Sequence, residues 1–194
     1  MVNCQTVHIC NCIPGRIRHS LAETYDRTLR EINRENWEFA HRMFQLVSVA
    51  SRSLHVRELA DLLAFDFEAG SIPKFQEDCR LEDPADGVLS TCSTLLAIVN
   101  YRGSPIIQFS HFYVKEFLTS TRLAKATDTI SSRYHVSMTP AHTLVAQTCL
   151  GILLHLCMDI TRDRRKKIPL AKYAAEHGVD HQGSRMCPKM CRMG

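Results

Sequence analysis

Two short β-prone runs, Leu95-Leu96-Ala97-Ile98-Val99 and Ile106-Ile107-Gln108-Phe109, flank Asn100-Tyr101-Arg102-Gly103-Ser104-Pro105. Two such runs around a loop containing Asn, Gly and Pro predict a β-hairpin. Elsewhere in the chain, apolar residues recur mainly at steps of three and four, which predicts helices. We therefore expect a mainly α protein that contains one small hairpin.

The residues before the hairpin predict a series of helices. Ser20-Leu21-Ala22-Glu23 matches a capping box, so we expect the first helix to begin there. Residues 37–47 and 54–65 carry further amphipathic patterns, and a surface loop over 68–86, with a helical turn near 75–79, leads to a short helix over 88–94. Helices followed by a two-stranded wing are typical of a winged-helix domain.

Helical pattern resumes after the hairpin at His111. A polar connector over 121–132 separates it from the clearest helix in the chain, for which Thr139 is a good N-cap and Pro140 suits the first turn. A basic run, Arg162 to Lys167, then precedes another helix that begins near Leu170. We expect both of these later helices to expose apolar faces, because a helix pair of this kind needs further partners to cover it.

The composition argues against several classes of protein. A net charge of +4 over 194 residues is too small to indicate nucleic acid or membrane binding. No uninterrupted apolar run approaches the roughly 18 residues needed to span a bilayer, and the N-terminal stretch does not resemble a signal peptide. Cys92, Cys149 and Cys157 lie in apolar patterns as small hydrophobic residues, so we expect reduced thiols and a cytoplasmic location.

The sequence can be tested for three functions: ATP hydrolysis, zinc binding and DNA binding. Phosphate-cradling glycine motifs are absent from the sequence, so we expect no ATP hydrolysis and no other enzyme activity. His8, Cys10, Cys12, Cys187 and Cys191 could supply ligands to zinc, but their spacing is not that of paired zinc knuckles, and we expect no metal site. The helix before the wing, residues 86–94, has no Lys or Arg, which disfavours DNA binding.

Three segments carry a resemblance to a known family: LAETYDRTLREI (21–32), ELADLLAF (58–65) and FSHFYVKEFL (109–118). In this order they resemble the winged-helix region of fungal NACHT-type signalling NTPases, many of which end in ankyrin repeats. Residues 141–156 look like the helix that follows in the same proteins. Tyr113 departs from the family pattern, which usually has Ser at that position.

The resemblance implies a role in a nucleotide-controlled switch. In the family, a P-loop NACHT domain holds ADP, and a winged-helix histidine contacts the ADP phosphate; His111 matches that histidine. An imidazole N–H at a helix start is a suitable phosphate donor. ADP or ATP would then be a cofactor only together with a NACHT domain, which makes such a domain, or a full-length relative, the expected partner.

The expected organisation follows from pattern and resemblance together. Residues 1–19 form a disordered or non-family tail, 20–122 the winged-helix region, 133–181 the start of a helical-arm domain, and 182–194 a divergent tail. We expect a non-catalytic regulatory or interaction module, a truncated paralogue or gene fragment. The alternative is a stand-alone winged-helix DNA-binding protein.

Overall fold

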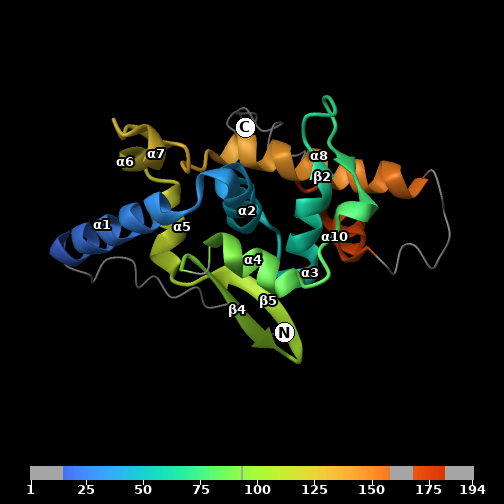
Figure 1. The fold of residues 1–194 in the computed structure, drawn as a ribbon, viewed down its shortest axis with the longest axis horizontal. Coiled ribbons are helices and arrows are strands. Elements are labelled where there is room, and N and C mark those ends of the chain that lie inside the picture. Colours follow the sequence, from blue (N-terminus) through green and yellow to red (C-terminus); the bar gives the residue numbers. More distant parts are fainter. Residues whose placement is uncertain (1–14, 93, 158–167, 182–194) are drawn as a thin grey trace, which may run out of the picture.

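The computed structural model describes residues 15–92, 94–157 and 168–181, and the described chain is mainly helical with a small sheet, as predicted. Figure 1 shows the longest helix along one side and a β-hairpin projecting from the opposite side. The elements in chain order are α1 (Gly15–Glu31), η1 (Arg34–Asn36), α2 (Trp37–Val49), β1 (Leu54–His55), α3 (Val56–Ala60), η2 (Asp61–Ala64), β2 (Phe65–Asp66), β3 (Lys74–Phe75), η3 (Glu77–Cys79), α4 (Pro84–Cys92), β4 (Leu96–Tyr101), β5 (Ser104–Phe109), α5 (Phe112–Leu118), α6 (Thr121–Ala124), α7 (Thr129–Ser132), α8 (Met138–Cys157) and α10 (Pro169–His177).

The predicted hairpin is confirmed, with strands β4 and β5 paired antiparallel. Its turn is shorter than the expected six-residue loop, because Arg102 and Gly103 alone connect the strands, with φ of 51° and 80°. Two successive positive φ values are the mark of a tight hairpin turn whose twist matches that of the strands. A third strand, β1, pairs with the inner edge through Leu54 and Ile107, which gives the sheet order β1-β5-β4.

The prediction of a single helix over residues 54–65 is wrong. The segment divides into the strand β1, the short helix α3 and the 3-10 turn η2. The division has a local cause, since the Glu58 carboxylate accepts a hydrogen bond from the His55 N–H at 2.8 Å and starts α3 after the strand. Leu54 is meanwhile buried against the hairpin, and sheet pairing outweighs the helical periodicity there.

The expected surface loop over 68–86 contributes the strand β3 to a second, smaller hairpin, whose other strand, β2, precedes it. Strands β2 and β3 pair through Phe65 and Phe75, whose ring centroids lie 5.2 Å apart. This hairpin approaches α8 closely, since a Cβ placed on Gly151 would lie 2.4 Å from the carbonyl oxygen of Pro73. The helical turn predicted near residues 75–79 is present as η3.

Helix α1 begins earlier than the capping box predicted. Residues 15–19 are helical, so Ser20 lies inside the helix, and its carbonyl accepts from the Thr24 hydroxyl at 3.0 Å. The predicted start of the first helix at Ser20 is therefore wrong. No helix-breaking residue separates the Pro14-Gly15 turn signal from Ser20, which explains why the helix extends back to Gly15.

Helix α8 lies across the body of the protein and packs on α2 and α10. It begins at Met138, one residue before the predicted cap, and by length and composition alone it would be long enough to cross a membrane. Its inner face is part of one continuous core that also includes residues of the sheet and of α1 to α5. The side chains that α8 buries in that core are Ala141, Val145, Thr148, Cys149, Ile152 and Leu156.

The prediction of exposed apolar faces is confirmed for α8 and wrong for α10. On α8, Leu150, Leu153 and Leu154 are 38%, 37% and 47% exposed. The large apolar side chains of α10 are buried against the rest of the protein. The connector over 121–132 is partly helical, with α6 and α7 within it, and the basic run 162–167 lies outside the described residues.

Candidate functional site: His111 and the polar junction under α10

His111, the predicted phosphate contact, is the N-cap of α5. Its Nδ1 accepts a hydrogen bond from the backbone N–H of Tyr113 at 3.2 Å. An accepting Nδ1 carries no proton, so the neutral ring has its hydrogen on Nε2. The ring is exposed and lies against two aromatic neighbours, with centroid distances of 4.5 Å to Phe112 and 5.3 Å to Tyr113.

This arrangement leaves one donor of His111 available. Among the described residues, its Nε2 has no hydrogen-bond partner, whereas Nδ1 is held by the helix. Stacking on the following aromatic residues restricts the direction of the ring. A fixed, exposed N–H can bind an anion that another molecule supplies.

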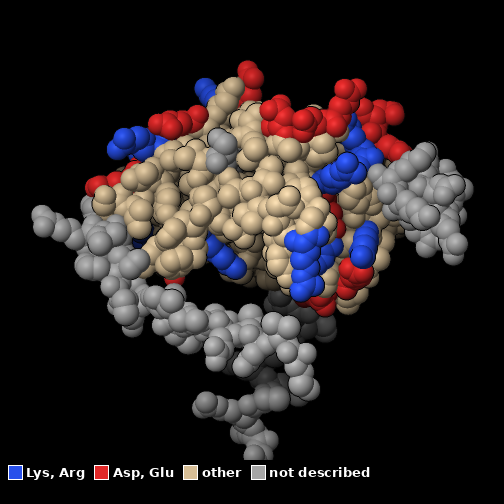
Figure 2. Space-filling view, turned by 90° about the horizontal axis from the view of Figure 1, so that it is seen from below, with Lys and Arg blue, Asp and Glu red and all other residues tan. Residues whose placement is uncertain are grey.

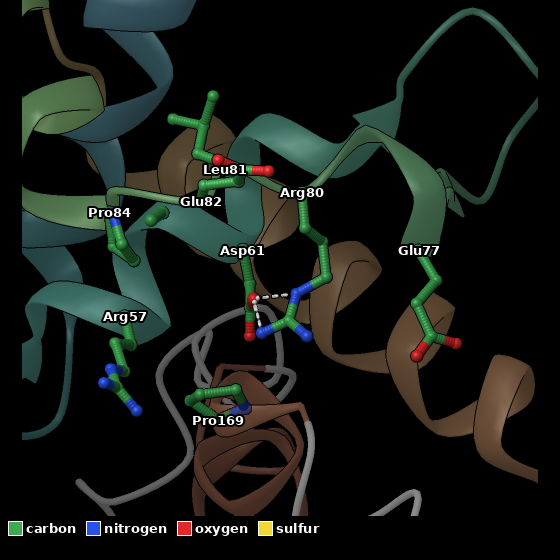
Figure 3. Close-up of a pocket in the computed structure, with 9 residues that line it drawn as sticks. Arg57, Asp61, Glu77, Arg80, Leu81, Glu82, Pro84 and Pro169 are labelled. Carbon is green, nitrogen blue, oxygen red and sulfur yellow. Dashed lines mark hydrogen bonds and ion pairs between the residues drawn. The ribbon is translucent and has the colours of Figure 1, made fainter.

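A second group of polar residues lies where α3 and η2 meet the start of α10. Asp61 is 2% exposed, and its Oδ1 accepts from the Nε of Arg80 at 2.9 Å. Its Oδ2 accepts from the backbone N–H of Leu170 at 3.0 Å, which caps the first turn of α10. Figure 3 shows Asp61 and Arg80 facing each other above Pro169.

The ionisation of Asp61 reflects opposing effects. Burial raises the pKa of its carboxyl group, while the Leu170 N–H and the Arg80 guanidinium act to lower it. The net direction is upward. Both carboxylate oxygens are used within the protein, so Asp61 acts as a structural acceptor that fixes α10 to η2.

A second buried carboxylate lies on α3, one turn before Asp61 in the chain. Glu58 accepts two hydrogen bonds from Arg52, at 2.6 Å and 2.7 Å, in a paired geometry. The guanidinium of Arg52 lies over the ring of Tyr173 on α10, 5.1 Å from its centroid. Side-chain hydrogen bonding to Glu58 is the largest cause that raises the pKa of Arg52. Two acidic residues of one short segment thus connect the sheet region to α10.

A chain of hydrogen bonds continues from Tyr173 into α8. The Ser51 N–H donates to the Tyr173 Oη at 3.1 Å, and this oxygen is 2.9 Å from the Nε2 of His181. The Nδ1 of His181 is in turn 3.0 Å from the Nδ1 of His142. If the tyrosine hydroxyl donates to Nε2, the other His181 nitrogen is the donor to His142. Burial lowers the pKa of His181, which favours this neutral form.

The cavity in Figure 3 has a volume of about 400 Å³ and a mixed charge. Arg57 and Arg80 line it together with Glu77 and Glu82, beside Asp61. The one buried carboxylate in it is saturated by its own partners. We therefore interpret this region as a junction that positions α10 relative to the sheet region.

The remaining surface bears on the alternative of DNA binding. Helix α4, which precedes the hairpin, carries no Lys or Arg and begins beside Asp83 and Asp86. Figure 2 shows the face that includes the hairpin; where it is not covered by grey atoms, Lys and Arg form separate spots. Within the described ranges there is no group of three potential metal ligands. The terminal cysteines and His8 considered for zinc lie outside those ranges.

No protein-family model, curated protein or solved structure matches the chain.

Sequence reasoning proposed His111 as a site residue, which stays a prediction, and it missed the junction under α10. Asp61 stands inside an apolar pattern, where an isolated acidic residue could have indicated a buried partner. Its partners Arg80 and Leu170 lie far along the chain, and no spacing rule connects them to it. His181 gave no signal, since a single histidine after a helix has no characteristic pattern.

Proposed function

We propose that this chain is a winged-helix module that regulates a NACHT-type NTPase by binding to its nucleotide-binding domain. The observation that carries the proposal is the order α2-β1-α3-α4-β4-β5, into which η2, the small hairpin of β2 and β3, and η3 are inserted between α3 and α4, combined with the sheet order β1-β5-β4. A winged helix has this sequence of elements, with the third strand placed between the first and the second. Strand β1 was not expected from the sequence, so it supports the assignment independently of the predicted hairpin.

The helical pair α8 and α10 fits the beginning of a helical arm. The pair packs on α2 and α3, and the Asp61 carboxylate holds the first turn of α10. A regulatory module has to transmit the movement of one part to another as a rigid unit. The buried ion pairs of Glu58 and Asp61 provide that rigidity, because separating them would leave buried charges without partners.

His111 is the residue that we assign to the nucleotide. In the proposed complex its Nε2–H donates to a phosphate of ADP held by the partner domain. The exposed position of the ring and its cap-fixed tautomer support this role. We propose no catalytic residue and no metal for this chain, and we place it in the cytoplasm with its partner.

The proposal can be tested with a purified NACHT domain from a fungal NACHT protein, loaded with ADP or with ATP. We expect this chain to bind the ADP-loaded domain in isothermal titration calorimetry and to bind the ATP-loaded domain more weakly. Equal affinity for both loaded states would contradict the proposal, because a ligand-dependent switch requires different contacts in two states.

The role of His111 has a variant that separates structure from binding. His111→Asn keeps an N-cap for α5, since Asn is among the best capping residues, but it lacks the Nε2 donor. We expect it to fold normally and to lose about tenfold or more in affinity, the worth of one hydrogen bond to a charged group. His177→Ala, on α10, serves as the matched control and should bind like the wild type.

Duplex DNA is the second ligand in the same experiment. Binding that weakens steeply with salt would favour a DNA-binding winged helix. We expect no such binding, because α4 presents no cation to the phosphates.

A further inference from the structure

A cleft beside α1 and α7, on the other side of the molecule from α10, has no part in the proposed function. It lies between the end of α1, η1, the start of α2 and α7, and its volume is about 320 Å³. Three guanidinium groups and several apolar side chains line it. Those used in the argument are Arg30, Arg34, Arg133, Ile32, Trp37 and Ile130.

Two of the three arginines have no carboxylate partner among the described residues. Arg30 is bound by two carboxylates, Asp26 at 3.1 Å and Asp128 at 2.8 Å. Within the described ranges, no carboxylate lies within 4 Å of the guanidinium of Arg34 or Arg133. Arg30 with its two carboxylates carries a net charge of −1, so Arg34 and Arg133 supply the cations that a ligand in the cleft can meet.

The wall formed by Arg30 and its carboxylate partners also makes the cleft rigid. Asp128 caps α7 by accepting from the backbone N–H of Ile130 at 3.2 Å and from Ser131, while it holds Arg30. Asn33 caps η1 by accepting from the N–H of Glu35 at 3.2 Å. The two segments that carry Ile130 and Arg34 are thus fixed by side-chain caps before any ligand binds, which reduces the entropy that binding would cost.

Arg133 is oriented for anion binding by Trp37. Its guanidinium carbon lies 5.2 Å from the centroid of the indole ring. A cation–π contact of this kind takes up none of the hydrogen-bond acceptors of a ligand, so the guanidinium N–H groups can still donate to an anion. Planar forks of donors match the oxygens of phosphate or carboxylate, and Arg34 adds a second fork to the same cleft.

The apolar lining indicates what the anion is attached to. Ile130 is 42% exposed at the cleft, and Ile32 and Trp37 are partly buried beside it. A flat ring would cover these groups while its anionic end meets the two arginines. A phosphomonoester presents three acceptor oxygens, which the donor groups of two guanidinium side chains can share, whereas a carboxylate presents two.

We propose that this cleft binds a phosphomonoester whose organic part carries a planar ring. Such chemistry has two sources, a free nucleoside monophosphate and a phosphotyrosine side chain of another protein. The volume of the cleft is at the lower end of the range for small-molecule sites, and it suits either. The inference rests on the cleft alone and does not depend on the proposed NACHT partner.

Trp37 gives the test a built-in reporter, since it is the only tryptophan in the chain. The intact protein is titrated with phenyl phosphate, and separately with inorganic phosphate and phenol, while its tryptophan fluorescence is recorded. Calorimetry provides a second readout that does not depend on the indole. We expect phenyl phosphate to bind at least about tenfold more tightly than inorganic phosphate, and phenol to bind more weakly still. Equal affinities for phenyl phosphate and inorganic phosphate would overturn the proposal.

Variants locate the site. Arg34→Ala and Arg133→Ala should each weaken phenyl phosphate binding about tenfold or more, as expected for the loss of a charge-assisted hydrogen bond. Arg133→Lys keeps the charge but not the planar fork, and it should also weaken binding if the wild-type stacking matters. Arg122→Ala, on α6 outside the cleft, should bind like the wild type. Unchanged affinity in both Arg34→Ala and Arg133→Ala would place the ligand elsewhere and refute the assignment.

Two larger probes distinguish the sources. Adenosine monophosphate and a short phosphotyrosine peptide are titrated in the same way, with adenosine and the unphosphorylated peptide as controls. Tighter binding of one of them than of phenyl phosphate supports the proposal and identifies its source. If neither binds more tightly than inorganic phosphate, the cleft does not recognise a phosphomonoester that carries a planar ring.

Discussion

The removal of Asp61 should be among the most damaging single changes at the junction. Asp61→Ala deletes the acceptor for the Leu170 N–H, and the loss of a helix cap costs about 1 kcal/mol. It also removes the hydrogen-bonded partner of Arg80, whose side chain is 28% exposed, so solvent screening limits this loss to roughly 1–2 kcal/mol. Together these losses predict a destabilisation of about 2–3 kcal/mol.

Urea unfolding followed by tryptophan fluorescence measures this change. For a chain of this length, 2–3 kcal/mol corresponds to a fall of roughly 4–12 °C in Tm, which a parallel thermal scan can check. Asp83→Ala is the matched control, because Asp83 accepts from the N–H groups at the start of α4 without an arginine partner. We expect that control to cost about 1 kcal/mol. An Asp61→Ala variant no less stable than Asp83→Ala would refute the role assigned to the junction.

The charge of Asp61 can be separated from its hydrogen bonds with Asp61→Asn. Because the folded-state pKa of Asp61 is raised, its protonation adds stability that is complete below the unfolded pKa and is lost as pH rises through the folded pKa. Asn does not titrate. The stability advantage of the wild type over Asp61→Asn should therefore shrink as pH rises from about 4 to about 7, and an advantage that grows over this range would contradict the assigned pKa direction.

Three other predictions concern single side chains. The pKa of His181 is lowered, so the stability from its neutral form is present above the ordinary value of about 6.5 and is lost as pH falls through the folded pKa; urea unfolding of His181→Gln should show a smaller loss between pH 7 and pH 5. Gly151→Ala should lower Tm, with a cost of about 1–3 kcal/mol, whereas an open helix position would gain stability. Burial raises the pKa of Cys149 to about 12, so iodoacetamide at neutral pH should leave it unmodified in the native protein while labelling the exposed Cys79 and Cys157, as peptide mass mapping would show.

Each of these three predictions would be contradicted by a specific result. An unchanged pH dependence in His181→Gln would mean that another group controls acid stability, and His41, whose pKa is also lowered, is the next to substitute. A stabilised Gly151→Ala would mean that the hairpin of β2 and β3 does not approach α8. Labelling of Cys149 at the rate of Cys157 would contradict its burial.

The parts of the fold that depend on nearby residues were predictable from the sequence. The hairpin of β4 and β5 and helices α2 and α8 follow from local periodicity and turn residues, and the structure contains all of them. Strand β1 could not be found in this way, because two residues carry no period and their partner strand lies far along the chain. The early start of α1 shows that a good local cap does not prevent a helix from continuing through it.

The sites likewise differ in whether they depend on nearby residues or on residues far apart in the chain. The prediction for His111 came from a resemblance over a short motif, and the structure adds its tautomer and exposure. The arginine cleft depends on residues from two separate segments, 30–37 and 130–134, which only the packing of α7 beside α1 brings together. No pattern within either segment indicates the other.

The placement of α8 on α2 has a consequence for synthesis on the ribosome. Helix α2 buries Met43, Phe44 and Leu46, and α8 is its main neighbour. While the chain emerges, α2 is made long before α8, so its apolar side remains uncovered for much of translation. Chaperones that hold exposed apolar segments would therefore be expected to bind nascent chains that end before residue 138 and to release longer ones. The point of release along the chain would show when the core closes.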